Sequence, residues 1–293
     1  MGRRTILAVS SLLLAAVGVL VQAIPSAAVP GSTGSAPVGP YVALGDSYAA
    51  GPLIPNQVDT ACLRSDHNYP SLVASALHIT VFRDVSCSGA TTADMTAGQH
   101  PLLGSVPPQF DALTPDTRLV TLTIGGNDIG FSNVVLTCGL LSLLNPFGAP
   151  CRDHYTAGGT DALAASIAAT APKVAAVLQA IHLRAPQARV AVVGYLDILP
   201  AAGGCWPLVP IAVGDVPYLG GIEVQLNQML ATQASLNQAT FVDTFTPSIG
   251  HDACEPIGVK WVEGLLPTSP AYPVHPNLLG MQADEAAVLS ALP

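Results

Sequence analysis

Two apolar runs in this chain each end abruptly in a turn of small and polar residues. Residues 42–44 run into the motif G-D-S at 45–47, and residues 120–124 run into the motif G-G-N-D at 125–128. A β-capable apolar run followed by such a turn predicts a buried strand whose carboxyl end opens into a loop. In open α/β sheets, ligands bind at that end of the strands. We therefore expect both turns to lie where a ligand binds.

The rest of the chain alternates between strand-like and helix-like stretches. This alternation predicts a parallel sheet with helices on both faces, in three layers. Asp161 opens a long alanine-rich stretch and is expected either to cap the helix there or to be an acidic residue of its first turn. We predict strands over 41–46, 79–85, 118–124, 188–195 and 240–245, and helices over 69–77, 90–97, 161–183, 222–235 and 277–292.

Four residues in or beside these turns carry groups suited to nucleophilic catalysis. Ser47 presents a hydroxyl that becomes a nucleophile if a base reaches it, although G-D-S alone also fits an ordinary serine-containing turn. The Asn127 amide, and the N–H of Gly89 at the start of a short helical stretch, are candidate donors to an oxyanion. His275 is a candidate base, and Pro276 fits the first position of the last helix.

Ser47, Gly89, Asn127 and His275, in this order, resemble the SGNH hydrolases, also called GDSL-type esterases and lipases. The four blocks span essentially the whole mature chain. The resemblance implies a flavodoxin-like three-layer α/β/α sandwich with a five-stranded parallel sheet. It implies Ser47 as nucleophile and His275 as general base. The implied oxyanion hole consists of the Ser47 and Gly89 N–H groups and the Asn127 side chain, with no metal or organic cofactor.

The chain departs from the family pattern at Tyr272, where most members carry an aspartate that orients the histidine. The second ring N–H of His275 still needs an acceptor. The chain resembles a secreted branch in which a main-chain carbonyl replaces the acid, and we assign that carbonyl to Tyr272, within the segment 272–274. A carboxylate from Asp197, Asp252 or Glu263 is the alternative. Since a carbonyl compensates an imidazolium less than a carboxylate does, we expect His275 to titrate near its unperturbed pKa of about 6.5.

All six cysteines lie in the mature part of the chain. An even number in an exported chain predicts disulfides, although six cysteines allow 15 pairings. The resemblance to the secreted branch favours sequential pairing. The spacing does not favour a metal site, because no C-x-x-C pair is present and the histidines are scattered. The expected bridges are Cys62–Cys87, Cys138–Cys151 and Cys205–Cys254.

The amino terminus has the features of an export signal. Arg3 and Arg4 precede an apolar run over 6–21, and small residues follow at 26–28. We predict a signal peptide over 1–28, a disordered linker over 29–38 and a single hydrolase domain over 39–293. The paired arginines leave twin-arginine export open, and an uncleaved anchor is the structural alternative. The mature protein is therefore expected outside the cytoplasm, secreted or in the cell envelope.

The charge balance excludes some partners. The formal net charge is −9 at pH 7, which argues against binding nucleic acid or anionic membranes through charge. We expect a monomer that acts on an acyl ester or lipid. Two long apolar segments, 140–147 and 199–219, are interpreted as loops that wall an acyl-chain pocket, with packing onto the core as the alternative.

The sequence therefore predicts a secreted serine esterase or lipase that forms an acyl-enzyme on Ser47. One alternative keeps the same site but acts on acylated carbohydrate or transfers the acyl group to another alcohol. A further alternative is a non-catalytic protein that binds cell wall or lipid. The complete set of Ser47, Gly89, Asn127 and His275 argues against this last alternative.

Overall fold

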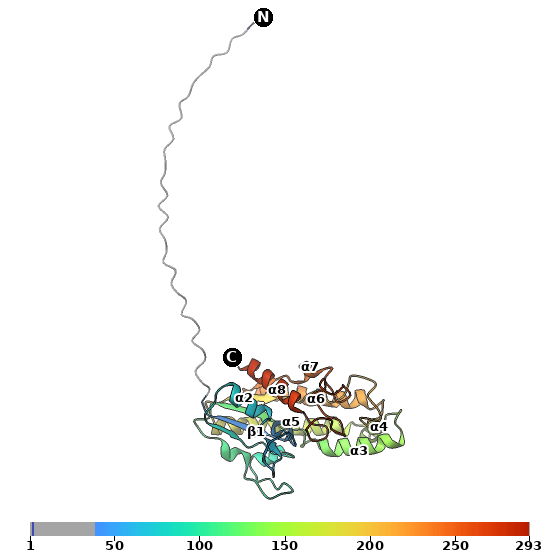
Figure 1. Cartoon of the computed structure of the whole chain (residues 1–293), viewed down its shortest axis with the longest axis horizontal. Helices are drawn as coiled ribbons and strands as arrows, with labels where there is room; N and C mark the ends of the chain where they lie inside the picture. Colours follow the sequence, from blue (N-terminus) through green and yellow to red (C-terminus); the bar gives the residue numbers. More distant parts are fainter. Residues whose placement is uncertain (1, 3–38, 293) are drawn as a thin grey trace. The chain divides into compact units, whose positions relative to one another are not determined.

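The computed structural model describes Gly2 and residues 39–292 (Figure 1). The expected signal peptide over 1–28, apart from Gly2, and the expected linker over 29–38 lie outside the described residues.

A five-stranded parallel sheet forms the centre of the domain. Tyr41 at the start of the first strand pairs with Phe82 on one side and with Leu119 on the other. The strand order is β4-β1-β5-β6-β7, which is the flavodoxin-like order that we expected. The strands are β1 (Tyr41–Gly45), β4 (Phe82–Asp84), β5 (Leu119–Thr123), β6 (Arg189–Val193) and β7 (Thr240–Val242), and a separate hairpin pairs β2 (Gln57–Asp59) with β3 (Arg64–Ser65).

Side chains alternate between the two faces of the sheet, as strand geometry requires. Val42 and Leu44 pack into a cluster with residues of α5 (Ala162–Arg184) and α6 (Val216–Leu236). Tyr41 and Ala43 pack into a second cluster with residues of α2 (Tyr69–Ala76) and α8 (Leu278–Ala291). Both faces are therefore covered, and the three-layer prediction is confirmed. The remaining helices are α1 (Ser47–Ala50), α3 (Phe131–Leu144), α4 (Pro150–Thr156) and α7 (Phe245–Ser248), with the 3-10 helices η1 (Thr92–Met95) and η2 (Gln109–Ala112).

Side-chain caps determine where two of the long helices begin. The Asp161 carboxylate accepts hydrogen bonds from the Leu163 and Ala164 N–H groups at the start of α5, as predicted. By length and composition alone α5 would suit a membrane span, but its buried face packs into the core. The prediction for Pro276 is wrong: Asn277 caps α8, so Pro276 precedes the cap rather than starting the helix.

Several predicted boundaries shift because of local backbone interactions. The Ile79 N–H donates to the Ala74 carbonyl and so closes α2, which makes β4 shorter than the predicted strand over 79–85. The strand predicted over 240–245 ends early because Phe245 starts α7. The short helix predicted over 90–97 is a 3-10 helix that begins at Thr92.

The segments 140–147 and 199–219 are not simple loops. Residues 140–144 belong to α3, and α6 begins at Val216, earlier than the predicted start at 222. Periodicity could not reveal α3, because its apolar residues lie on all sides of the helix and mark no single face.

The six cysteines form three disulfides in the order expected. The bridges join Cys62 to Cys87, Cys138 to Cys151 and Cys205 to Cys254.

Burial of Asp284 makes the stability of the fold depend on pH. This α8 side chain is buried, and its Oδ1 has no hydrogen-bond partner among the described residues. Desolvation raises the pKa of Asp284 well above its ordinary value. An unfolded aspartate ionises above about pH 3.9, so above that pH the folded state binds more protons than the unfolded state. The free energy of unfolding therefore falls as pH rises through this window.

We expect Asp284→Asn to remove this dependence. The free energy of unfolding of the variant minus that of the wild type should increase from about pH 4 to about pH 7. The increase should be up to about 1.4 kcal/mol per pH unit. Denaturant unfolding at both pH values measures this difference. Glu285→Gln, at the partly exposed neighbouring position, is the control. A difference that stays constant with pH would contradict the proposed protonation state.

Candidate active site

Ser47 and His275 meet although 228 residues separate them in sequence. The Ser47 Oγ lies 2.7 Å from the His275 Nε2. Ser47 is the first residue of α1, directly after β1, and His275 lies in the loop before α8. The carboxyl end of β1 and the loop before the last helix therefore converge at the same edge of the sheet. Ser47 is partly exposed, whereas only 7% of His275 is accessible.

The turn that carries Ser47 is fixed by the side chain before it. Asp46 caps α1, and its Oδ1 accepts a hydrogen bond from the Tyr48 N–H at 2.9 Å. Gly45 has a φ of +146°, and a Cβ there would lie 2.6 Å from the Thr123 carbonyl oxygen, so only glycine fits. The Ser47 N–H belongs to the first helical turn, where N–H groups have no intrahelical partner.

A second aspartate brings the other two expected oxyanion donors together. The Asp128 carboxylate accepts hydrogen bonds from both the N–H and the hydroxyl of Thr92, at the start of η1. The Asn127 amide donates to the Ala90 carbonyl at 2.9 Å. Since an amide nitrogen carries two N–H groups, this bond fixes the Asn127 side chain and leaves one donor for a ligand.

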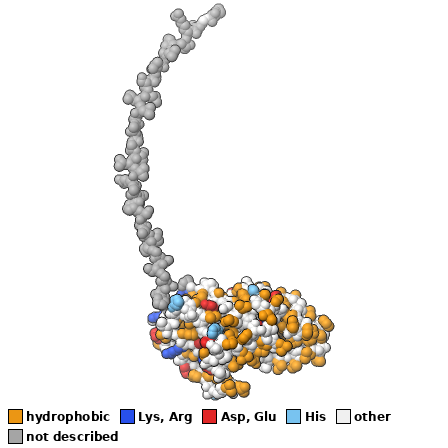
Figure 2. Space-filling model, in the orientation of Figure 1, with side chains coloured by type: hydrophobic (Ala, Val, Ile, Leu, Met, Phe, Trp, Pro, Cys, Tyr) orange, Lys and Arg blue, Asp and Glu red, His pale blue; other side chains and the backbone are white. Residues whose placement is uncertain are grey.

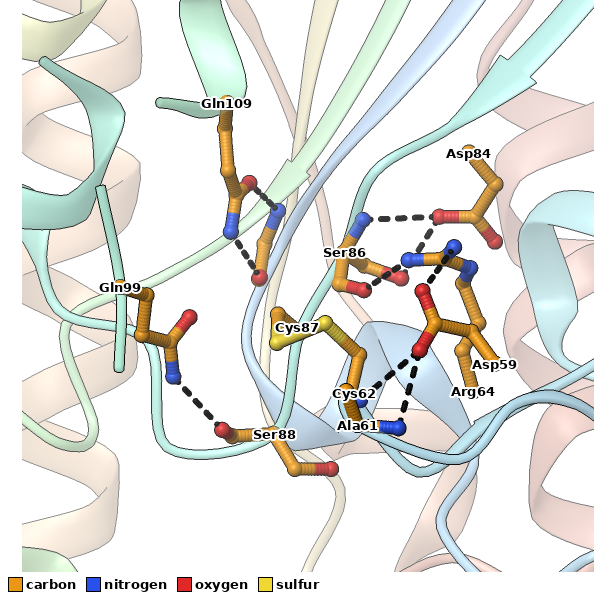
Figure 3. Close-up of a disulfide and its surroundings, with 11 residues drawn as sticks. Asp59, Ala61, Cys62, Arg64, Asp84, Ser86, Cys87, Ser88, Gln99 and Gln109 are labelled. Carbon is orange, nitrogen blue, oxygen red and sulfur yellow. Dashed lines mark hydrogen bonds and ion pairs between the residues drawn. A yellow bond between two sulfur atoms is a disulfide. The ribbon is translucent and has the colours of Figure 1, made fainter. Parts of the chain in front are cut away.

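The segment that carries Gly89 is held by a disulfide and by Gln99, and Gln109 holds the neighbouring nucleophile turn (Figure 3). Cys87 is bonded to Cys62, and the Gln99 amide donates to the Ser88 carbonyl at 2.8 Å. Gln109 pairs with the backbone of Gly45 through both its oxygen and its nitrogen. Gly89 itself has a φ of +81° and precedes η1 by several residues, so the expectation that it opens a helix is wrong. Within the part of the chain that the structure describes, its N–H has no acceptor.

A backbone carbonyl orients His275, but it belongs to Pro273 and not to Tyr272. The distance from His275 Nδ1 to the Pro273 oxygen is 2.8 Å. A carbonyl can only accept, so Nδ1 carries the proton and Nε2 is free to accept one from Ser47. The Tyr272 carbonyl accepts instead from the His275 backbone N–H at 3.2 Å. Val274, between them, has a φ of +60°, and this tight turn directs the Pro273 oxygen rather than the Tyr272 oxygen toward the ring.

The three alternative carboxylates have other partners. Glu263 forms an ion pair with Lys260 at 3.1 Å and accepts from the Asn277 amide at 2.9 Å. Its backbone N–H donates to the His275 carbonyl, so Glu263 supports the histidine loop without contacting the ring. Asp252 accepts a hydrogen bond from the Cys254 N–H at 2.8 Å. The pKa of Asp197 is raised to about 6, mainly by desolvation and to a smaller extent by the charge of Asp252.

Burial changes how the proposed base titrates. Desolvation lowers the pKa of His275 to about 4, and the hydrogen bond to Pro273 opposes only part of that shift. The expectation of a pKa near 6.5 is therefore wrong. The carbonyl carries no full charge to offset the loss of water around the imidazolium.

An apolar cavity opens beside Ser47. It contains about 1020 Å³ of atom-free space, including its open mouth. The segment 199–219 contributes walls as expected, whereas α3 contributes its first turns and not residues 140–147. Its apolar lining includes Phe131, Val134, Leu199, Val209, Ile211 and Leu226.

Glu223 is one of the polar residues among the apolar lining of this cavity. Its Oε2 accepts from the Ile198 N–H at 3.2 Å, while its Oε1 has no partner among the described residues. Desolvation raises the pKa of Glu223 well above its ordinary value. Burial therefore favours the neutral form of the Glu223 carboxyl.

A tyrosine links the nucleophile turn to the G-G-N-D turn. The Tyr195 hydroxyl donates to the Asp46 Oδ2 at 2.6 Å and accepts from the Gly126 N–H at 2.8 Å. Tyr195 lies just beyond β6, although the sequence predicted it as the last residue of the strand over 188–195. The Tyr48 hydroxyl makes a similar link by donating to the Val274 carbonyl at 2.9 Å. Neither residue type nor spacing indicated these two roles, or the roles of Gln109 and Pro273.

No group of three or more His, Cys, Asp or Glu side chains among the described residues is arranged to hold a metal ion.

Comparison with known proteins identifies the family. The sequence profile of the GDSL-like lipase/acylhydrolase family matches residues 43–283, so the chain belongs to this family. It is a carboxylic ester hydrolase. The chain is 42% identical over 274 residues to "Lipase 2" of Streptomyces coelicolor, which covers 91% of this chain and 90% of that protein.

Solved structures agree with this assignment. The crystal structure of phospholipase A1 from Streptomyces albidoflavus matches with a TM-score of 0.71 and 29% identity, covering 87% of this chain and 99% of that one. The extracellular lipase from Streptomyces rimosus matches with a TM-score of 0.66 and 28% identity, covering 86% and 99%.

We predict that Tyr195→Phe lowers kcat with little change in KM. The change leaves a buried Asp46 oxygen and the Gly126 N–H unpaired, which typically destabilises a fold by about 1–3 kcal/mol and here loosens both turns. Steady-state kinetics on a soluble ester measure the effect. Tyr69→Phe is the matched control, because the buried Tyr69 hydroxyl bonds to Thr123 at 3.0 Å on the other face of the sheet. If kcat falls equally in the two variants, Tyr195 supports the fold in general and does not specifically position the catalytic turns.

We also predict that the acid limb of kcat/KM lies well below pH 6.5. The free enzyme loses its base only when His275 is protonated, and burial lowers the pKa of His275 to about 4. Asp46 titrates nearby, with a pKa raised to about 7 by desolvation. The Asp46→Asn variant therefore shows which residue causes the acid limb. If His275 causes it, the apparent pKa of kcat/KM should stay near 4 in this variant. An acid limb near 6.5 in both proteins would show that burial does not control His275.

Proposed function

We propose that this protein is a secreted lipase or esterase that hydrolyses acyl esters of lipids through an acyl-enzyme on Ser47. The observation that carries the proposal is the 2.7 Å contact between Ser47 Oγ and His275 Nε2 beside the apolar cavity. Export after removal of residues 1–28, and a monomeric state, belong to the same proposal. The names of its relatives, lipase and esterase, favour this function over a carbohydrate deacylase, an acyltransferase or a binding protein.

The first half of the reaction acylates Ser47. His275 Nε2 takes the hydroxyl proton as Ser47 Oγ attacks the ester carbonyl carbon, with the acyl chain in the apolar cavity. The carbonyl oxygen becomes an oxyanion that accepts hydrogen bonds from the Ser47 N–H, the Gly89 N–H and the Asn127 amide. His275 then gives its proton to the alcohol oxygen as the carbon–oxygen bond breaks, and the alcohol leaves.

The second half releases the acid. His275 takes a proton from water, whose oxygen attacks the acyl carbonyl and forms a second oxyanion in the same hole. Collapse of this intermediate breaks the bond to Ser47 Oγ, which regains its proton from His275. The Pro273 carbonyl holds the ring in the required tautomer throughout.

Replacement of Ser47 tests the proposal. Ser47→Ala should abolish both ester hydrolysis and labelling by a serine-reactive organophosphonate, while thermal unfolding remains as in the wild type. Asn127→Ala should lower kcat by about 10²–10³, the usual effect of losing one oxyanion donor. Ser290→Ala removes a distant hydroxyl on α8 that bonds only within its own helix, and should change nothing. Hydrolysis by folded Ser47→Ala at the wild-type rate would refute the mechanism.

A panel of p-nitrophenyl esters of graded chain length tests the acyl specificity. The size of the apolar cavity predicts that kcat/KM rises from acetyl to longer chains, because each methylene buried there contributes about 0.8 kcal/mol. A preference for acetyl esters would instead support the carbohydrate deacylase.

A further inference from the structure

Helix α3 exposes a row of large apolar side chains. Leu136, Leu140, Leu143 and Leu144 follow one another at helical spacing and so share one face, and Phe147 continues the row just beyond the helix. Each of the five is between 57% and 84% exposed. Soluble domains rarely expose a contiguous apolar patch of this kind unless it contacts something. We call this set the α3 row.

The surroundings of the α3 row lack charge. No ionisable side chain occurs from residue 129 to residue 151 apart from the disulfide-bonded Cys138 and Cys151. Figure 2 shows apolar side chains gathered over the end of the domain that carries α3, whereas the Lys and Arg side chains visible on this face lie at the other end. A helix that is apolar on all sides is normally buried on all sides, so the exposed side of α3 lacks a partner.

Helix α3 carries both the α3 row and part of the wall of the apolar cavity. The opposite side of α3 lines that cavity through Phe131 and Val134. The segment that contains the cavity residues Val209 and Ile211 is tied to the end of α3, because the Val213 N–H donates to the Pro146 carbonyl and the Ala212 N–H to the Ser142 hydroxyl.

Two further exposed leucines lie beside the cavity. Leu208 is 72% exposed and precedes Val209, and Leu266 is 81% exposed and follows the cavity residue Leu265. A Cβ at Gly264 would lie 3.8 Å from the Leu208 carbonyl, so these two segments are neighbours. Exposed apolar side chains therefore occur both on α3 and on the segments that wall the cavity.

We propose that the α3 row docks on the surface of a lipid aggregate of zwitterionic or neutral lipids, from which the ester enters the cavity. The inference rests on the proposed lipid-ester hydrolysis. Leu and Phe side chains on a helix that lies in the interface plane are the groups that bind such surfaces. The net charge of −9 gives no attraction to anionic lipids, so binding depends on apolar contact.

A lipid surface fits this face better than a protein does. The helix that carries the α3 row also walls the cavity, as does the segment bonded to its end, so a surface bound here lies close to the site that takes the ester. A lipid aggregate supplies that ester, and its acyl chains can leave the aggregate for an apolar cavity without crossing water.

The double variant Leu140→Ser with Leu144→Ser tests the proposal. Its binding to phosphatidylcholine vesicles, measured by flotation in a Ser47→Ala background that prevents hydrolysis, should be at least about tenfold weaker than that of the single Ser47→Ala protein. With Ser47 present, the double variant should hydrolyse the vesicles correspondingly more slowly. It should retain kcat/KM on water-soluble p-nitrophenyl butyrate, because neither leucine lines the cavity.

Leu183→Ser with Leu236→Ser is the matched control. These leucines are 82% and 72% exposed and lie at the ends of α5 and α6 that lead into the amino ends of strands, away from the active-site edge. The control should bind and hydrolyse vesicles like the wild type. Adding an anionic phospholipid to the vesicles should not strengthen binding.

Three results would overturn the proposal. The first is wild-type protein that does not bind the vesicles, and the second is binding that the Leu140 and Leu144 changes leave intact. The third is a dimer of the wild type that these changes dissociate without altering vesicle binding, which would make the α3 row a contact between copies of the chain. If the wild type itself did not hydrolyse p-nitrophenyl butyrate, the proposed function would be refuted. Failure of the docking proposal and failure of the proposed function are therefore distinguishable.

Discussion

The geometry of the site depends on one buried carboxylate. Asp46 caps the helix that begins with Ser47 and accepts the Tyr195 hydroxyl, which in turn accepts the Gly126 N–H. Three strand ends, those of β1, β5 and β6, are thereby joined by one chain of hydrogen bonds. Because all its members are buried, an unpaired atom in this chain would be costly. The nucleophile and the Asn127 turn therefore keep their mutual position without a contribution from a bound ligand.

The histidine loop is held by different means. Tyr48 donates to the Val274 carbonyl, and Glu263 supports the loop through Asn277 and through its own backbone. Glu263, one of the three carboxylates considered for orienting His275, thus supports the histidine loop but does not bond to the ring. The ring itself depends on a neutral carbonyl, which fixes the tautomer but does little to stabilise a positive charge. Burial then dominates the pKa of His275 and lowers it, a state in which the unprotonated base is available over a wide pH range.

Helix α3 connects the chemistry with the surface. One side of it forms the cavity wall beside Ser47, and the other side carries the α3 row in contact with solvent. The disulfide between Cys138 and Cys151 ties this helix to α4. Although α3 is apolar on all sides, only its side that faces the domain stabilises the fold. The exposed side needs a contact outside the domain, and for this reason we propose that it docks on the lipid aggregate that contains the ester.

The sequence by itself determined the three-layer class, the strand-to-turn positions of Ser47 and Asn127 and the late histidine. It could do so because strand alternation, small-residue turns and motif order are local in the chain. The pairing of the cysteines came from resemblance to relatives and not from spacing. Only the tertiary structure decided that Pro273, and not Tyr272, accepts from the histidine ring, since a single positive φ at Val274 rotates the peptide groups around it. It also decided the link through Tyr195, the depressed pKa of His275 and the exposure of α3, because each of these depends on which distant segments pack together, and neither residue type nor periodicity encodes that.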